Sequence, residues 1–128
     1  MGVTFTIWDN HTYCQENKLI GETVYECQCV NFPEYQNNCR ECNGTKKVRF
    51  DDVPYELNIC YSTLHKIFEL SHVIADEVGG EMDPEKLLPF FHNVADYFSN
   101  ERGHPISGAV YGAILIEAIR RKQPVCWS

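Results

Sequence analysis

Alternation between hydrophobic and polar positions characterises the first half of the chain. Val3, Phe5 and Ile7 alternate with more polar neighbours, which predicts a strand over residues 3–8 with one buried face. Similar patterns predict three further strands, over residues 22–30, 46–50 and 55–61. The segments 22–30 and 46–50 are expected to pair as a β-hairpin, with the cysteine-rich residues between them at its tip.

The hydrophobic period becomes helical after residue 61. Apolar residues at helical spacing predict a helix over residues 62–78, with Ser62 as its N-cap and Gly79-Gly80 as its stop. Asp83-Pro84 predicts a short capped turn, and a helix is expected from about residue 89 to residue 98.

The last predicted helix covers about residues 106–122 and is apolar on nearly every side up to Ile119. This composition predicts the most buried helix of the protein. Gly108 and Gly112 lie four residues apart in it, so we expect another element of the same chain to approach closely there. The basic residues 120–122 stand where the helix dipole is negative, which favours a charge complement over a nucleic-acid patch.

These elements predict an α+β fold in which a small antiparallel sheet with a zinc-binding β-hairpin packs against two or three C-terminal helices. A chain of 128 residues suffices for one core. We therefore expect a single domain over residues 1–128. Residues 1–61 should be mainly β, with the hairpin at 22–50, and residues 62–128 mainly helical.

Four of the seven cysteines lie within residues 27–42 and are the candidate metal ligands: Cys27, Cys29, Cys39 and Cys42. The pair Cys39 and Cys42 has the C-x2-C spacing of a zinc knuckle and is followed by Asn43-Gly44. Cys27 and Cys29 are two apart, so an extended strand would hold their Cα atoms about 6.6–7 Å apart. Sharing one ion therefore requires a kink at Gln28. Four thiolates close the coordination of Zn²⁺, which predicts one structural zinc ion.

Disulfides are the competing interpretation of the cluster. Seven is an odd number, so complete intramolecular pairing leaves one thiol over. No secretory signal pattern or membrane-length apolar run is present, and we expect a cytoplasmic protein whose thiols stay reduced. Unligated thiols are the third reading.

The stretch CRECNGTKK resembles one knuckle of the zinc-binding region of DnaJ-type co-chaperones, whose units read C-x2-C-x-G-x-G. Cys39, Cys42 and Gly44 match this unit, whereas Lys46 replaces its second glycine. The resemblance covers about eight residues and none of the J-domain, so it implies metal binding and not chaperone activity. The following segment, from YELNICYSTLHKIFEL to GGEMDPEKLLPFF, is similar to small uncharacterised bacterial or phage proteins, which imply no known chemistry.

The charge pattern disfavours one class of partner. The formal charge is −7, and residues 51–80 carry one lysine against six acidic residues. A protein that binds a phosphate backbone would be expected to be basic, so nucleic acid is disfavoured as a partner. Lys46, Lys47 and Arg49 are the residues on which a nucleic-acid-binding zinc module would depend.

Other candidate chemistry is sparse, and we assign no catalytic or cofactor-binding residue. His11, Cys14 and Cys126 could form a second metal site if the chain ends meet. His65, Glu69 and His72 have helical spacing, although an exposed polar stripe explains them equally. The usual phosphate loop, nucleophile elbow, metalloprotease and deaminase patterns are missing. An HNH-type nuclease, suggested by His92 and His104, lacks its paired strand histidines.

The sequence therefore favours a zinc-stabilised binding or adaptor module that contacts a protein partner. The identity of this partner and the oligomeric state of the chain stay open. A small enzyme that uses the histidines or Cys60 between sheet and helices is the alternative. A nucleic-acid-binding zinc module is a further alternative.

Overall fold

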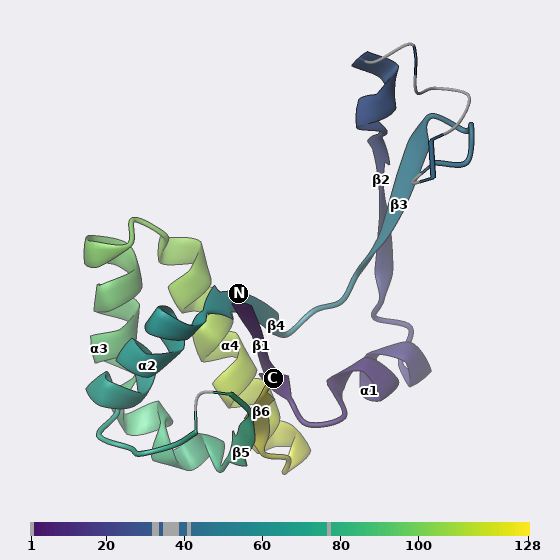
Figure 1. Cartoon of the computed structure of the whole chain (residues 1–128). Coiled ribbons are helices and arrows are strands. Elements are labelled where there is room, and N and C mark those ends of the chain that lie inside the picture. The colour runs from purple at the N-terminus through teal and green to yellow at the C-terminus, as the bar shows by residue number, and fades with distance from the viewer. Residues whose placement is uncertain (1, 32–33, 35–38, 41, 77) are drawn as a thin grey trace. The chain divides into compact units, whose positions relative to one another are not determined.

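The computed structural model describes residues 2–31, 34, 39–40, 42–76 and 78–128. Two compact units make up the chain: Met1–Tyr13 with Tyr55–Ser128, called here the sheet–helix unit, and Cys14–Pro54, called the hairpin unit. Whether they form one domain, as the sequence analysis predicts, stays a prediction. The helix α1 (Asn10–Glu16) runs from the first unit into the second (Figure 1).

The sheet–helix unit contains a four-stranded antiparallel sheet in the order β4-β1-β6-β5. Its strands are β1 (Gly2–Ile7), β4 (Glu56–Cys60), β5 (Gly80–Met82) and β6 (Val125–Trp127). Its helical elements are α2 (Tyr61–Leu70), the 3-10 turns η3 (Pro84–Lys86) and η4 (Leu88–Phe90), α3 (Phe91–Asp96), the π-helical turn η5 (Tyr97–Glu101) and α4 (Pro105–Arg121). The predicted α+β class is confirmed.

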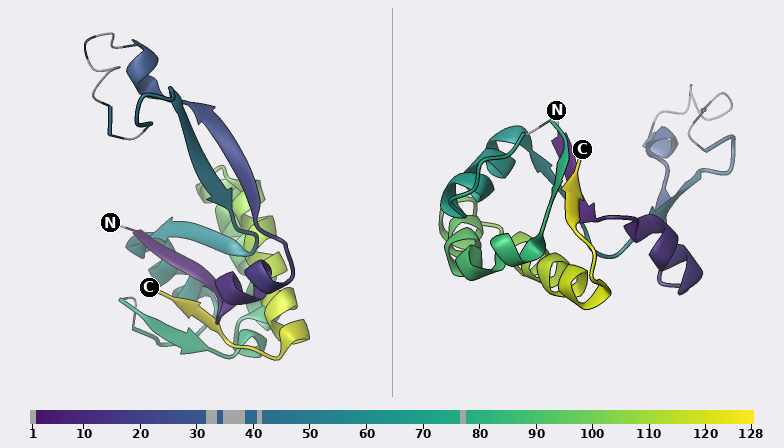
Figure 2. Two further views of the ribbon diagram at one scale, coloured as in Figure 1. Left: turned by 90° about the vertical axis from the view of Figure 1, so that its right-hand side faces the viewer. Right: turned by 90° about the horizontal axis from the view of Figure 1, so that it is seen from below.

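The core of this unit lies between the sheet and the helices α2, α3 and α4, which gather on one face of the sheet (Figure 2). Val3, Phe5 and Ile7 of β1 are buried on that face, as their alternation predicts. The Phe5 ring contacts the rings of Tyr111 and Trp127, at centroid distances of 5.5 and 6.5 Å. The chain termini meet in the sheet, where Thr4 and Ser128 exchange two backbone hydrogen bonds.

The predicted helix over residues 62–78 is wrong at both ends. It begins after Cys60, which is the N-cap in place of Ser62, and it ends at Leu70. His72 adopts a left-handed φ of 55°, and the Val73 N–H donates to the Phe68 carbonyl over 3.1 Å. This Schellman motif ends the helix without a glycine. Ile74, expected on its buried stripe, is fully exposed.

The C-terminal helix agrees closely with its prediction. α4 ends with Lys122 in the left-handed region, and its face is buried at Gly108 and Gly112. A Cβ atom at Gly112 would lie 2.6 Å from the ring of Phe91, and one at Gly108 would lie 3.4 Å from the Cα atom of Ala95. The close approach expected at the two glycines is therefore made by α3 of the same chain.

Three elements escape the sequence analysis: α1 and the short strands β5 and β6. α1 lies between two predicted strands, in a segment for which no element was predicted, and β6 lies beyond the last predicted helix. The capped turn at Asp83 is present as predicted, since its carboxylate accepts from the Glu85 N–H over 2.9 Å. Among the described helices, none combines the length and the apolar character needed to cross a membrane.

The hairpin unit is built on a two-stranded antiparallel sheet of β2 (Gly21–Glu26) and β3 (Lys47–Asp52). The 3-10 turn η1 (Gln28–Asn31) follows β2. Val48 of β3 packs against the cysteine cluster at the end of the ribbon. The side chains of Arg49 and Phe50 lie outside the described part of the structure.

Candidate metal centre

The first cysteine pair is placed by the end of β2. The predicted strand over residues 22–30 is too long, because β2 ends at Glu26 and η1 begins at Gln28. The Cys27 N–H donates to the Lys46 carbonyl over 2.8 Å, and the Val30 N–H donates to the Cys27 carbonyl over 3.2 Å. The chain thus bends between Cys27 and Cys29, as a shared ion requires.

The second pair is placed by a knuckle of hydrogen-bonded turns. The Asn43 N–H donates to the Cys39 carbonyl over 3.1 Å, and the Thr45 N–H donates to the Cys42 carbonyl over 3.0 Å. The Thr45 hydroxyl donates to the same Cys42 carbonyl over 2.6 Å. These contacts fold the backbone around the two sulfur atoms.

Left-handed backbone completes the knuckle at the two positions where the DnaJ-type unit has glycine. Gly44 has a φ of 85° and Lys46 a φ of 64°. An L-residue in this region has a conformational cost of about 1–2 kcal/mol that glycine avoids. Lys46 therefore differs from the glycine of the DnaJ-type unit in residue type, but its backbone adopts the left-handed conformation that glycine favours.

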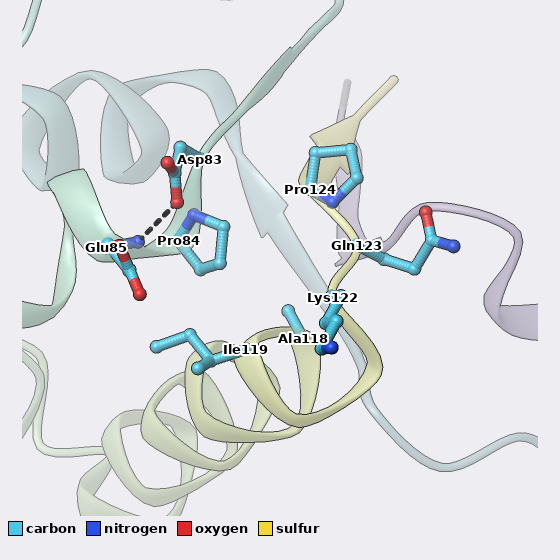
Figure 3. Close-up of a pocket in the computed structure, with 8 residues that line it drawn as sticks. All are labelled: Asp83, Pro84, Glu85, Ala118, Ile119, Lys122, Gln123 and Pro124. Atoms are coloured by element: carbon cyan, nitrogen blue, oxygen red, sulfur yellow. Dashed lines mark hydrogen bonds between the residues drawn. The ribbon is translucent and has the colours of Figure 1, made fainter.

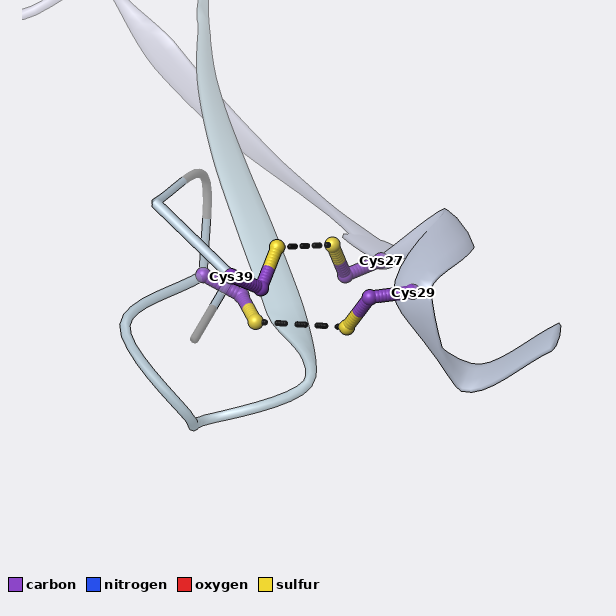
Figure 4. A group of neighbouring side chains, drawn as sticks. Cys27, Cys29 and Cys39 are labelled. Carbon is purple, nitrogen blue, oxygen red and sulfur yellow. Dashed lines mark hydrogen bonds between the residues drawn. The ribbon is translucent and has the colours of Figure 1, made fainter. Parts of the chain in front are cut away.

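The four thiols converge at the end of the ribbon (Figure 4). Their Sγ atoms all lie within 4.8 Å of one another. The Cys27 and Cys39 sulfurs are 3.7 Å apart, and the Cys29 and Cys42 sulfurs are 3.5 Å apart. Zinc–thiolate bonds of about 2.3 Å in a tetrahedron imply sulfur separations of about 3.8 Å. The cluster therefore has the size that a tetrahedral thiolate site requires.

Burial and mutual contact shift the pKa values of Cys29 and Cys42 in opposite directions. Burial is the largest influence on Cys29, and with the neighbouring thiols it raises the pKa to about 12. Burial also opposes ionisation of Cys42, but hydrogen bonds from Cys29 and from the backbone N–H groups of Gly44 and Lys46 lower its pKa to about 7. Four crowded thiolates need a cation to coexist, and a divalent metal supplies that charge.

The donor set also limits what a bound metal can do. Four sulfur ligands are typical of structural zinc sites, in which no coordination position is left for water or substrate. Within the described ranges, these cysteines are the one group of three or more His, Cys, Asp or Glu side chains close enough to share an ion. That they hold a metal stays a prediction.

The other candidate ligands do not join such a group in the described structure. All five histidines are exposed: His11, His65, His72, His92 and His104. His65 approaches Glu69 at 4.0 Å, whereas the ring of His72 lies against Phe90. Cys14 is buried on α1, and Cys126 is half-buried in β6.

Cys60 is a candidate for a reactive thiol, although no sequence motif around it indicates reactivity. Its Sγ atom lies 3.1 Å from both the Ser62 and the Thr63 hydroxyl oxygens, at the start of α2. Those hydrogen bonds lower the pKa of the Cys60 thiol to about 6, and the one with the Ser62 hydroxyl has the largest effect. Helix N-termini favour a thiolate in the same direction.

Two of the three basic residues at the end of α4 share one acidic partner within the sheet–helix unit. Glu117 binds Arg120 and accepts from Arg121 Nε over 3.0 Å. The Arg121 guanidinium stacks on the Tyr13 ring at 3.6 Å, and it donates to the Asn10 side chain over 2.8 Å. These contacts occupy both arginines, whereas the predicted complement to the helix dipole stays a prediction.

Comparison with family models, with curated proteins and with solved structures finds no match to this chain. The resemblance to the DnaJ-type unit therefore rests on the local knuckle alone. The cysteine cluster and the exposed surfaces of the chain are the features that indicate a function.

Proposed function

We propose that the chain is a zinc-stabilised binding module that acts in the cytoplasm through contacts with a protein partner. The observation that carries this proposal is the convergence of Cys27, Cys29, Cys39 and Cys42 within 4.8 Å. One Zn²⁺ on these thiolates is structural, because its coordination is closed.

A zinc ion would supply stability that the described part of the hairpin unit otherwise has little of. A two-stranded ribbon is at best marginally stable by itself. Among the described residues of this unit, the buried cluster consists of cysteines, with Val48 packed against it. The metal therefore takes the place of a hydrophobic core at the ribbon end.

Protein binding is supported by exposed apolar side chains in both units. Val24 and Tyr25 on β2 are 45% and 55% exposed. Ile74 is fully exposed and Val78 is 72% exposed in the loop after α2. Each of these side chains can bury apolar surface against a partner. The net charge of −7, together with the pairing of Lys47 opposite Glu26, argues against a nucleic-acid phosphate backbone as the partner.

The experiment is a zinc-dependent binding assay. The metal-loaded chain is immobilised beside the Cys39→Ser variant, and bound host proteins are cross-linked and identified. A defined protein retained by the parent and lost from the variant supports the proposal. Equal retention by both chains, or retention of nucleic acid alone at low salt, contradicts it.

A thiol-dependent enzyme is the second candidate function, and the lowered pKa of Cys60 favours it. The test is the rate of alkylation by iodoacetamide as a function of pH, with Cys60→Ser to identify the signal. A half-maximal rate near pH 6 supports a reactive thiolate. A midpoint in the ordinary thiol range removes the candidate.

A further inference from the structure

A cavity with a volume of about 440 Å³ lies in the sheet–helix unit. It is bounded by η3, by the end of α4 and by the segment that leads to β6. Figure 3 shows Pro84 and Pro124 on opposite sides of it, with Ala118 and Ile119 below. These four side chains give the cavity an apolar lining that no element of the described chain fills.

The walls of the cavity are held by local hydrogen bonds. Asp83 caps η3 by accepting from the Glu85 N–H over 2.9 Å. At the end of α4, the N–H groups of Lys122 and Gln123 donate to the Ile119 and Ala118 carbonyls over 3.1 and 3.0 Å. A cavity held in this way is largely formed before a ligand arrives, which reduces the ordering cost of binding.

Charge is unevenly placed around the apolar lining. Asp83 and Glu85 supply two carboxylates, and Lys122 supplies one ammonium group. In the described part of the chain, neither Glu85 nor Lys122 has an ion-pair partner within 4.0 Å. The whole sheet–helix unit contains 11 acidic residues against six lysines and arginines. The residues that line the cavity therefore carry a net charge of −1, and this charge favours a cation over an anion.

We propose that this cavity receives a lysine or arginine side chain from a segment of a partner protein. The aliphatic stem of such a side chain packs on Pro84 and Ile119, while its charged end reaches Glu85 and the Asp83 oxygen that does not cap η3. Lys122 repels a second cation and thereby limits the site to one basic side chain. The proposal rests on the protein-binding function proposed above and names the chemistry of one contact.

The test is a titration of the ¹⁵N-labelled, zinc-loaded full chain with acetyl-trilysine amide, followed by NMR. The expected result is a saturable shift of the backbone amide signals of Glu85, Ile119 and Lys122. The matched probe is the same peptide with every lysine acetylated, which keeps the stems and removes the charges. It is expected to bind at least fivefold more weakly.

Three variants assign the binding to the cavity. Glu85→Gln is expected to weaken trilysine binding by about threefold to tenfold, and Lys122→Gln to strengthen it. Glu69→Gln, an exposed change of the same charge on α2, is the control and should leave the affinity nearly unchanged. Equal weakening by Glu85→Gln and Glu69→Gln would show only diffuse attraction and would overturn the proposal.

Spermine separates a protein segment from a small polycation. If spermine binds the cavity as tightly as the peptide, the site recognises free polyamines and the partner segment is wrong. Absence of any shift at the cavity also overturns the proposal. That failure would leave the zinc-dependent binding assay unaffected, because the exposed apolar side chains of β2 and of the loop after α2 are separate surfaces.

Discussion

Replacing Gly112 with alanine tests the packing of α4 against α3. The new methyl carbon would lie 2.6 Å from Cε2 of Phe91 and 2.8 Å from its Cζ atom. The Phe91 ring is half-buried and stacks with Tyr111 at a centroid distance of 6.4 Å, so it can move only by giving up packing. The substitution therefore adds volume where the structure has none to spare.

Two opposing terms set the magnitude. Glycine in a helix interior is about 1 kcal/mol less favourable than alanine, which would make Gly112→Ala stabilising in open space. Overpacking costs about 1–3 kcal/mol. The free energy of unfolding is therefore expected to fall by roughly 0–2 kcal/mol. Gly112→Leu, which adds more volume, should cost at least as much.

A double-mutant cycle separates these terms. In a Phe91→Ala background the methyl group has room, and Gly112→Ala should then raise the free energy of unfolding by about 1 kcal/mol. Gly108→Ala is the control, because its methyl group would meet Ala95 and Phe98 at 3.4–3.5 Å, an ordinary contact distance. The assay is urea unfolding followed by circular dichroism, with light scattering to give the oligomeric state.

A full gain of about 1 kcal/mol from Gly112→Ala in the parent, without coupling to Phe91, would refute the packing described here. A stable Gly112→Leu variant with a changed oligomeric state would show instead that the glycine face is an interface between chains.

Three further substitutions probe the sheet–helix unit by urea or thermal unfolding. His72→Gly should stabilise it by about 0–1.5 kcal/mol, because glycine avoids the left-handed cost of about 1–2 kcal/mol at the end of α2 but loses about 0.5–1 kcal/mol more conformational entropy on folding; a loss of more than about 0.5 kcal/mol would contradict this. Because the pKa of Cys60 is lowered to about 6 in the folded state, its thiolate stabilises the fold at alkaline pH. The stability advantage over Cys60→Ser should therefore shrink as the pH falls from about 9, the ordinary pKa of the thiol, to about 6, and a constant difference over this range would contradict it. Arg121→Ala should cost about 1.5–3 kcal/mol, since it removes the hydrogen bonds from the buried guanidinium to Glu117 and to the Asn10 side chain, whereas a change below about 0.5 kcal/mol would contradict the network.

The sequence predicts the parts of the fold whose periodicity is long. β1 and α4 are correct because several side chains on one face are buried in each. The end of α2 was missed because its left-handed residue is His72, and sequence rules expect glycine there. α4 ends in the same way at Lys122, where the predicted helix also ends. β5 and β6 have three residues each, too few to show a period.

In the candidate metal centre too, the features that depend on local residue spacing could be predicted, and those that depend on the folded arrangement could not. The spacing of Cys39 and Cys42 predicts a knuckle, and the need for a kink at Gln28 follows from the spacing of Cys27 and Cys29. Which sulfurs lie closest could not be predicted, because it depends on how the two arms of the ribbon meet. The low pKa of Cys60 was also hidden, since it depends on hydroxyl groups that are close only once α2 begins.

Native mass spectrometry of the purified, reduced full chain tests the central claim most directly. The account predicts one zinc ion per parent chain and none on Cys42→Ser, whose hairpin amide signals should also collapse in an NMR spectrum. Cys126→Ser, a cysteine outside the cluster, should keep its zinc. A metal-free parent whose hairpin is fully folded, with the four cysteines as thiols or as disulfides, would contradict the claim.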